Sequence, residues 1–172
     1  MDGPRAGTHL GVQSPPALTL VPNLVAGHDG AGLGATMVRM STDLLDIERL
    51  LSDYAWGCDE GDWGLLRSVF SDDAQLDYSS TGGPLGGRDE VVAWLQSSLS
   101  GIRIQHVVSN FRIDVTGDSA AGKAMFLTTV HLEGLAQPLT TGGYYDLGFV
   151  RVDGQWKVHR LREDNRWMHP AR

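Results

Sequence analysis

Two histidines, an aspartate and a tyrosine carry side chains suited to acid–base chemistry: His106, His131, Asp59 and Tyr78. Either histidine can exchange a proton near neutral pH, because an unperturbed imidazole has a pKa of about 6.5. Asp59 could fix the tautomer of a histidine and support its charge. Tyr78 could donate a hydrogen bond to a developing enolate or hold a water molecule. This set suits the dehydration of a β-hydroxy carbonyl compound, and we expect neither a metal nor an organic cofactor.

Asp59 has an unfavourable position for an acid. It falls in the last turn of a predicted helix that begins near residues 41–43, where the helix dipole is negative and repels a carboxylate. It therefore needs a partner or a task. We expect one of the two histidines, His106 or His131, to be that partner and leave open at this point which one it is. Period-two alternation in two adjacent strands can place both histidines on the inner face of a sheet.

The remaining elements follow from hydrophobic spacing and turn residues. Helical spacing predicts a short helix after the N-cap candidate Asp62 and a longer helix over residues 88–99. Strands are predicted over residues 74–78, 102–115 with a bulge at 109–110, 119–132, 141–152 and 155–162. Helices first and hairpin-linked strands afterwards indicate an α+β class. We expect a cone-shaped α+β barrel, in which a curved antiparallel sheet wraps three N-terminal helices around one deep apolar pocket.

Bulk properties exclude several classes of protein. The chain has 172 residues, 41% of them hydrophobic, and a formal charge of −7, so nucleic acid and membrane surfaces are poor partners. The single cysteine, Cys58, rules out an intrachain disulfide and a cysteine zinc site. We expect a cytoplasmic protein. Residues 1–40, rich in Gly, Pro and Ala, predict a disordered extension, and residues 41–172 predict one domain.

The stretch from Tyr54 to Tyr78 and the loop-to-helix entry at residues 86–91 resemble the nuclear transport factor 2-like superfamily. Within it the chain resembles the SnoaL-like group, closest to the scytalone dehydratases, over residues 43–167. The resemblance implies a cofactor-free lyase. It gives His106 the central acid–base role, lets His131 hydrogen-bond Asp59, and makes Tyr78 a water-binding tyrosine.

The substrate-facing wall departs from the family pattern. A second tyrosine is expected just before the aspartate, where this chain has Cys58. A serine and an asparagine are expected where it has Gly143 and Tyr145. We assign these three residues and Tyr54 to substrate contact. The acid–base set is thus kept, and we expect a small hydrophobic substrate other than scytalone, cyclic or polyketide-like.

Other interpretations remain open at this stage. A polyketide cyclase or a ketosteroid-isomerase-like proton shuttle would use Asp59 as the base, and a non-catalytic module would only bind a ligand. His106, His131 and Asp59 could also form a two-histidine, one-carboxylate metal site, although their spacing does not favour it. Trp56, Trp63, Trp94 and Trp156 are expected to be core residues. The open face of the sheet predicts a homo-oligomer, a dimer or a trimer.

Overall fold

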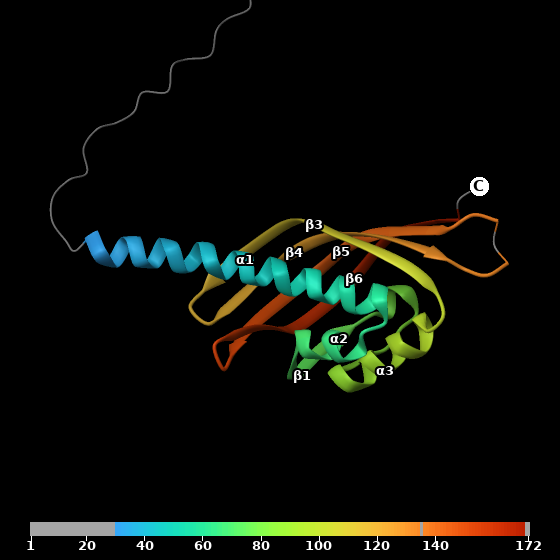
Figure 1. Ribbon diagram of the computed structural model, residues 1–172, viewed down its shortest axis with the longest axis horizontal. Helices are drawn as coiled ribbons and strands as arrows, with labels where there is room; N and C mark the ends of the chain where they lie inside the picture. The colour runs from blue at the N-terminus through green and yellow to red at the C-terminus, as the bar shows by residue number, and fades with distance from the viewer. Residues whose placement is uncertain (1–29, 135, 171–172) are drawn as a thin grey trace, which may run out of the picture.

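The computed structural model describes residues 30–134 and 136–170. Its helical elements are α1 (Gly30–Glu60), α2 (Trp63–Val69), the short 3-10 helix η1 (Ser79–Thr81) and α3 (Arg88–Leu99). Its strands are β1 (Phe70–Asp77), β2 (Leu85–Gly87), β3 (Arg103–Thr116), β4 (Ser119–His131), β5 (Leu139–Val152) and β6 (Gln155–Pro170). Helix α1 lies along one face of the curved sheet, and α2 and α3 lie beside its C-terminal end (Figure 1).

The strands form one six-stranded sheet in the order β2-β1-β6-β5-β4-β3. Four of the five pairings are antiparallel, and β1 runs parallel to β6. The sheet is therefore mixed and unclosed, with β2 and β3 at its edges. The predicted α+β class and the curved sheet around three helices are confirmed. The sheet differs from the predicted barrel in being open and in having one parallel pair of strands.

Helix α1 begins eleven to thirteen residues earlier than predicted, at Gly30 instead of residues 41–43. Adding turns to an existing helix is much easier than nucleating one, and no proline interrupts residues 30–40. The Gly- and Ala-rich composition that predicted disorder does not prevent this extension. Residues 1–29 of the predicted disordered extension lie outside the described residues.

Local signals elsewhere predicted the elements well. Asp62 caps α2 by accepting a hydrogen bond from the backbone N–H of Leu65 at 2.9 Å. Helix α3 has the predicted bounds. The β3 bulge is present, with Asn110 at φ 53° and a register shift beside it. Strand β1 begins earlier than predicted, at Phe70, which pairs with Val158 of β6. Strand β6 extends to Pro170, because its residues beyond Arg162 pair with β5.

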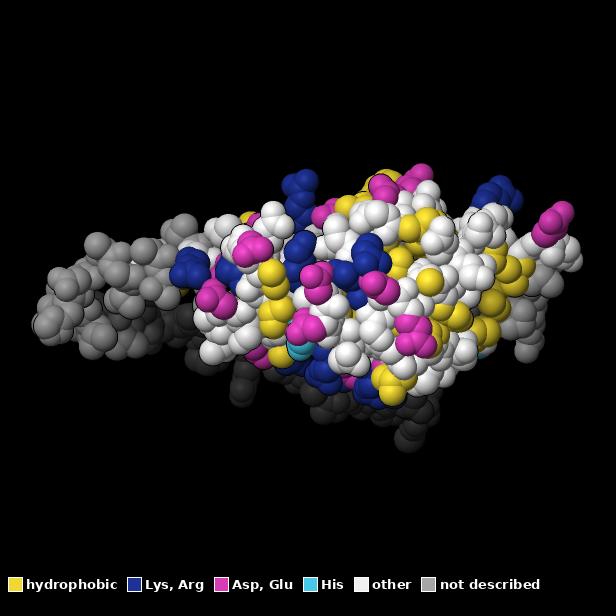
Figure 2. Space-filling model, turned by 90° about the horizontal axis from the view of Figure 1, so that it is seen from below, with side chains coloured by type: hydrophobic (Ala, Val, Ile, Leu, Met, Phe, Trp, Pro, Cys, Tyr) yellow, Lys and Arg dark blue, Asp and Glu magenta, His cyan; other side chains and the backbone are white. Residues whose placement is uncertain are grey.

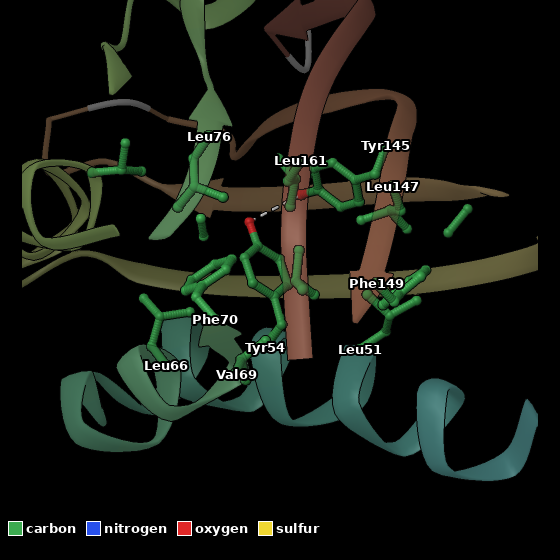
Figure 3. Packing of buried hydrophobic residues seen from close by; sticks show 14 of the residues in the cluster. Leu51, Tyr54, Leu66, Val69, Phe70, Leu76, Tyr145, Leu147, Phe149 and Leu161 are labelled. Atoms are coloured by element: carbon green, nitrogen blue, oxygen red, sulfur yellow. Dashed lines mark hydrogen bonds between the residues drawn. The ribbon is translucent and has the colours of Figure 1, made fainter. Parts of the chain in front are cut away.

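The core fills the space between α1 and the sheet. Leu51 and Tyr54 of α1 pack toward Tyr145, Leu147 and other inward-facing strand residues (Figure 3). A second contact fixes α1 near its middle: Asp43, 5% exposed, accepts hydrogen bonds from Arg151 at 2.5 Å and from the indole N–H of Trp156 at 3.4 Å. The helix is thus tied to the sheet by apolar packing and by this ion pair.

The surface seen from below carries acidic and basic side chains interspersed over much of its area (Figure 2). Hydrophobic side chains gather toward the end of the molecule away from the start of α1 (Figure 2). None of the helices in the described part of the chain is long and apolar enough to cross a bilayer.

Candidate active site

Asp59 and His106 form a closely bonded pair. Oδ1 of Asp59 lies 2.6 Å from Nδ1 of His106. The backbone N–H of His106 also donates to the carboxylate, with its nitrogen 3.1 Å from Oδ1 and 2.9 Å from Oδ2. The side chains are 16% and 8% exposed, so water screens the contact little. These bonds offset the repulsion that Asp59 meets at the C-terminal end of α1.

The edge position of β3 makes this pairing possible. An edge strand leaves backbone N–H groups without a strand partner, and Asp59 reaches across from α1 to accept one of them. The same carboxylate then receives the ring of that residue. One side chain therefore fixes both the backbone and the imidazole of His106 to the end of α1.

The pairing determines which ring nitrogen is free. An ionised carboxylate can only accept, so Nδ1 of the neutral imidazole carries the proton and Nε2 holds a lone pair. Across the described residues, no fully buried polar side-chain atom lacks a hydrogen-bond partner. Nε2 has no such partner there, and it therefore keeps some surface that water can reach.

A hollow of about 460 Å³ adjoins the pair, which is within the size range of small-molecule sites. Asp59 and His106 line it together with residues from α1, β3 and β4: Ala55, Trp56, Glu60, Arg103, Ile104, Gln105, Thr129 and His131. Trp56 was expected in the core, but it is 60% exposed at the rim of this hollow. The helical spacing of the apolar residues could have shown this, since Trp56 falls outside the Leu51, Tyr54 and Cys58 stripe.

The predicted pairing of Asp59 with His131 is wrong. His131 lies directly opposite Arg103 in the β3–β4 ladder, and Arg103 is three residues from His106. An odd separation along a strand reverses the direction of the side chain, so His131 and His106 point to opposite faces. His131 is exposed and lines the hollow without a hydrogen bond to Asp59, whose carboxylate is taken by His106. The register between β3 and β4, which alternation alone does not fix, decided this outcome.

Three tyrosines assigned to catalysis or substrate contact form a hydrogen-bonded cluster inside the cone. The hydroxyl of Tyr54 lies 2.8 Å from that of Tyr78 and 3.3 Å from that of Tyr145. All three are buried, and burial raises the pKa of each phenol well above its usual value. They are therefore neutral hydrogen-bonding groups. The Tyr54 ring also meets the His106 ring edge-on at 6.2 Å, which joins the cluster to the acid–base pair.

Cys58 and Gly143, also assigned to substrate contact, are buried. Burial, reinforced by the charge of Asp59, raises the pKa of the Cys58 thiol to about 12, so it is no nucleophile at neutral pH. A side chain at Gly143 would place its Cβ 2.1 Å from the carbonyl oxygen of Asp164, at a register shift between β5 and β6. Gly143 thus permits close strand approach, which explains the loss of a side chain there.

No group of three or more His, Cys, Asp or Glu side chains within residues 30–134 and 136–170 is arranged to hold a metal ion. The two histidines of the metal alternative point to opposite faces of the sheet, as their register shows. Sequence reasoning also missed Glu163, an acid that β6 turns toward the interior opposite Tyr145. No motif marks it, because the last strand was predicted to end before it.

Comparison with known proteins agrees with this architecture. A family model described as the SnoaL-like domain matches residues 39–162. A Mycobacterium tuberculosis protein described as uncharacterized is 32% identical over 124 residues, which cover 71% of this chain and 84% of that protein. A Mycobacterium bovis protein, also described as uncharacterized, matches with the same values.

Solved structures share the fold at lower identity. A candidate scytalone dehydratase from Novosphingobium aromaticivorans superposes with a TM-score of 0.68 at 24% identity, covering 74% of this chain and 87% of that one. A hexachlorocyclohexane dehydrochlorinase from Novosphingobium barchaimii gives a TM-score of 0.68 at 23% identity, covering 78% of this chain and 93% of that one. At these identities the likeness establishes the fold.

Proposed function

This chain belongs to the SnoaL-like domain family, within the nuclear transport factor 2-like superfamily, and we propose that it is a cofactor-independent lyase. The reaction is a dehydration, or the reverse hydration, of a small cyclic or polyketide-like hydroxy-carbonyl compound. The observation that carries this proposal is the Asp59–His106 pair beside a hollow of small-molecule size.

His106 is the acid–base residue in this scheme. Its Nε2 lone pair removes the proton from the carbon next to the substrate carbonyl. Asp59 acts through His106 by holding Nδ1–H and stabilising the imidazolium that forms. Tyr54, Tyr78 and Tyr145 supply neutral hydroxyls on the inner side, where a hydroxyl could stabilise a developing enolate. His131, which also lines the hollow, is left with substrate contact.

Two of the structural neighbours are named for eliminations, a dehydratase and a dehydrochlorinase. Both reactions remove a proton and a leaving group from adjacent carbons. The neighbours therefore support the reaction class proposed here, while their low identity leaves the substrate to experiment.

The test uses a panel of cyclic and open-chain β-hydroxy ketones. Formation of the conjugated enone is followed by ultraviolet absorption, and exchange of the α-hydrogen in deuterium oxide is followed by NMR. We expect both activities in the wild type and neither in His106→Ala. Full activity in a correctly folded His106→Ala variant would refute the assignment.

An isomerase-like or cyclase-like proton shuttle is the runner-up, with Asp59 as the base. Both Asp59 oxygens already accept hydrogen bonds from His106, which favours a supporting role for the carboxylate. The pH–rate profiles of Asp59→Asn and His106→Ala separate the two schemes. A pure ligand-binding module would show neither elimination nor exchange with any compound of the panel.

We also propose that the partner of this chain is a second copy of itself. Exposed apolar side chains occupy the outer face of the sheet on strands β3 to β6, among them Val107, Leu127, Tyr144 and Trp167. Val107 lies opposite Leu127 in the ladder, so the apolar surface is continuous between two strands. Light scattering during gel filtration should give the mass of a dimer or a trimer, and a monomer at all concentrations would contradict this.

A further inference from the structure

A band of polar side chains crosses the inner face of the sheet from His106 to the opposite side of the cone. The register places His106 opposite Thr128 and Thr128 opposite Thr141, so the three side chains share one face. Asn165 of β6 continues the line by donating from Nδ2 to Oγ1 of Thr141 at 2.5 Å. Glu163, two residues further along β6, faces inward opposite Tyr145. We call these five residues the inner polar band.

Two polar atoms at the His106 end of the band have no protein partner in the part of the chain that the structure describes. Thr128 is only 5% exposed, and its hydroxyl makes no hydrogen bond within the described residues. Since no fully buried polar side-chain atom there lacks a partner, this oxygen keeps some surface that water can reach. The same holds for Nε2 of His106. Both atoms are therefore free to bond a water molecule or a polar group of a substrate.

Glu163 is the only carboxyl group of the band, and no basic side chain among the described residues pairs with it. Its Oε2 accepts a hydrogen bond from Oγ1 of Thr81 at 2.6 Å, and Ser80 donates to it as well. Burial raises the pKa of Glu163, and the charge of Asp77 on β1 raises it further. The two hydrogen bonds and the charge of His106 lower this pKa, but burial outweighs them. Facing it are Cys58 of α1, Tyr78 just after β1 and Tyr145 of β5, all neutral at physiological pH.

We propose that Glu163 is the general acid of this site and delivers the proton to the leaving hydroxyl. A carboxyl group that burial holds protonated to higher pH than an exposed one is suited to that task, and a base and an acid held in different environments can work at one pH. The inference rests on the proposed elimination. It adds to that scheme the group that His106 alone does not supply.

The proton balance closes without a further reactant. Nε2 of His106 takes the α-proton, the C–H electron pair forms the C=C bond, and the C–O bond breaks. Glu163 gives its proton to the departing oxygen, which leaves as water. An imidazolium and a carboxylate remain; His106 then releases its proton to water and Glu163 takes one up from water, which restores the starting state.

The first test does not depend on a substrate. Protein labelled with carbon-13 in the glutamate side-chain carboxyls is titrated by NMR, with Glu163→Gln identifying the Glu163 signal and the exposed Glu90→Gln as the matched control. We expect Glu163 to titrate above the ordinary glutamate value of about 4.3. In His106→Gln its pKa should rise further, because a cationic imidazole favours the ionised carboxylate. A Glu163 signal that titrates at or below the ordinary value, or that ignores His106→Gln, overturns the proposal.

The second test varies the leaving group. The aldol adduct of acetone and benzaldehyde loses hydroxide and needs an acid, whereas its acetate ester loses acetate and needs little help. We expect Glu163→Gln to slow the hydroxyl compound at least tenfold more than the ester, and Glu90→Gln to slow neither. A merely structural role for Glu163 would slow both alike, and would overturn the assignment.

His106→Ala should slow both compounds, which keeps the two proposals apart. Loss of both reactions in His106→Ala with no effect of Glu163→Gln removes the acid assignment and leaves the lyase proposal standing. A wild type inert toward both compounds counts against the proposed function for this substrate class. The titration then decides whether Glu163 is a neutral acid coupled to His106.

Discussion

Helix α1 carries two carboxylates that each bind a cation or base on the sheet, and the two contacts differ in kind. Asp43, near the middle of the helix, binds the guanidinium of Arg151 at 2.5 Å. Asp59, near its end, binds the imidazole of His106 at 2.6 Å. Both acids are largely shielded from water, and both tie α1 to the sheet. A close ion pair alone therefore does not identify a catalytic site.

The partners and the surroundings make the difference. Arg151 keeps its proton at any physiological pH. Its guanidinium carbon lies 4.3 Å from the centre of the Trp156 ring, and its Nε donates a second hydrogen bond to Asp118. Burial works to raise the pKa of Asp43, but the hydrogen bonds from Arg151 and Trp156 outweigh it and lower that pKa. His106 can exchange a proton and borders a hollow. The first contact is structural and the second is suited to chemistry.

The largest expected effect separates the two partners. His106→Ala should reduce turnover by about 10²- to 10⁴-fold, the range for loss of a general acid–base residue. Its thermal stability should change less, because the backbone N–H of residue 106 keeps its hydrogen bond to Asp59. Steady-state kinetics and a thermal melt measure the two quantities, and Arg151→Ala should show the reverse pattern.

Asp59→Asn should reduce turnover on the order of a hundredfold, because the amide cannot hold Nδ1–H and stabilise the imidazolium in the same way. The kinetic pH profile should change shape as the histidine loses its carboxylate. A loss larger than that of His106→Ala would instead favour Asp59 as the base.

Asp43→Asn should destabilise the fold by roughly 2 kcal/mol and leave turnover within about twofold, since one partner of a shielded pair is lost. The folded-state pKa of Asp43 is lowered, so its stabilisation is present above the unfolded value of about 3.9 and is lost as the pH falls through the folded value. Urea unfolding should show the variant and the wild type converging at acid pH. An equal difference at every pH would contradict the ion-pair role.

The smallest expected effect on stability concerns Glu163, a carboxyl group that no basic side chain among the described residues pairs with. Its folded-state pKa is raised, so its contribution to stability is complete below the unfolded value of about 4.3 and is lost as the pH rises through the folded value. Glu163→Gln should therefore gain stability relative to the wild type as the pH rises. Urea unfolding at several pH values measures this, and a relative loss on raising the pH would exclude a buried neutral acid.

Local signals in the sequence predicted the elements, and contacts between distant segments decided the site. Neighbouring residues determine three of these features: the cap at Asp62, the bulge at Asn110 and the whole of α3. The choice of His106 over His131 as the partner of Asp59 depends on the register between β3 and β4. A slip of one residue in that register would turn each side chain to the opposite face of the sheet. Glu163 was missed because β6 is longer than its alternation suggests, extended by pairing with β5.

The bond from the His106 backbone to Asp59 has a consequence for solubility. Strand β3 is a free edge on which another chain could add a strand. Asp59 accepts the hydrogen bond of one backbone N–H on this edge, that of His106, near the start of the strand. A negative charge there also repels an incoming carbonyl row. Evolution of new activities in this chain is therefore constrained at Asp59 twice: a substitution that changes the chemistry also uncovers a surface prone to aggregation.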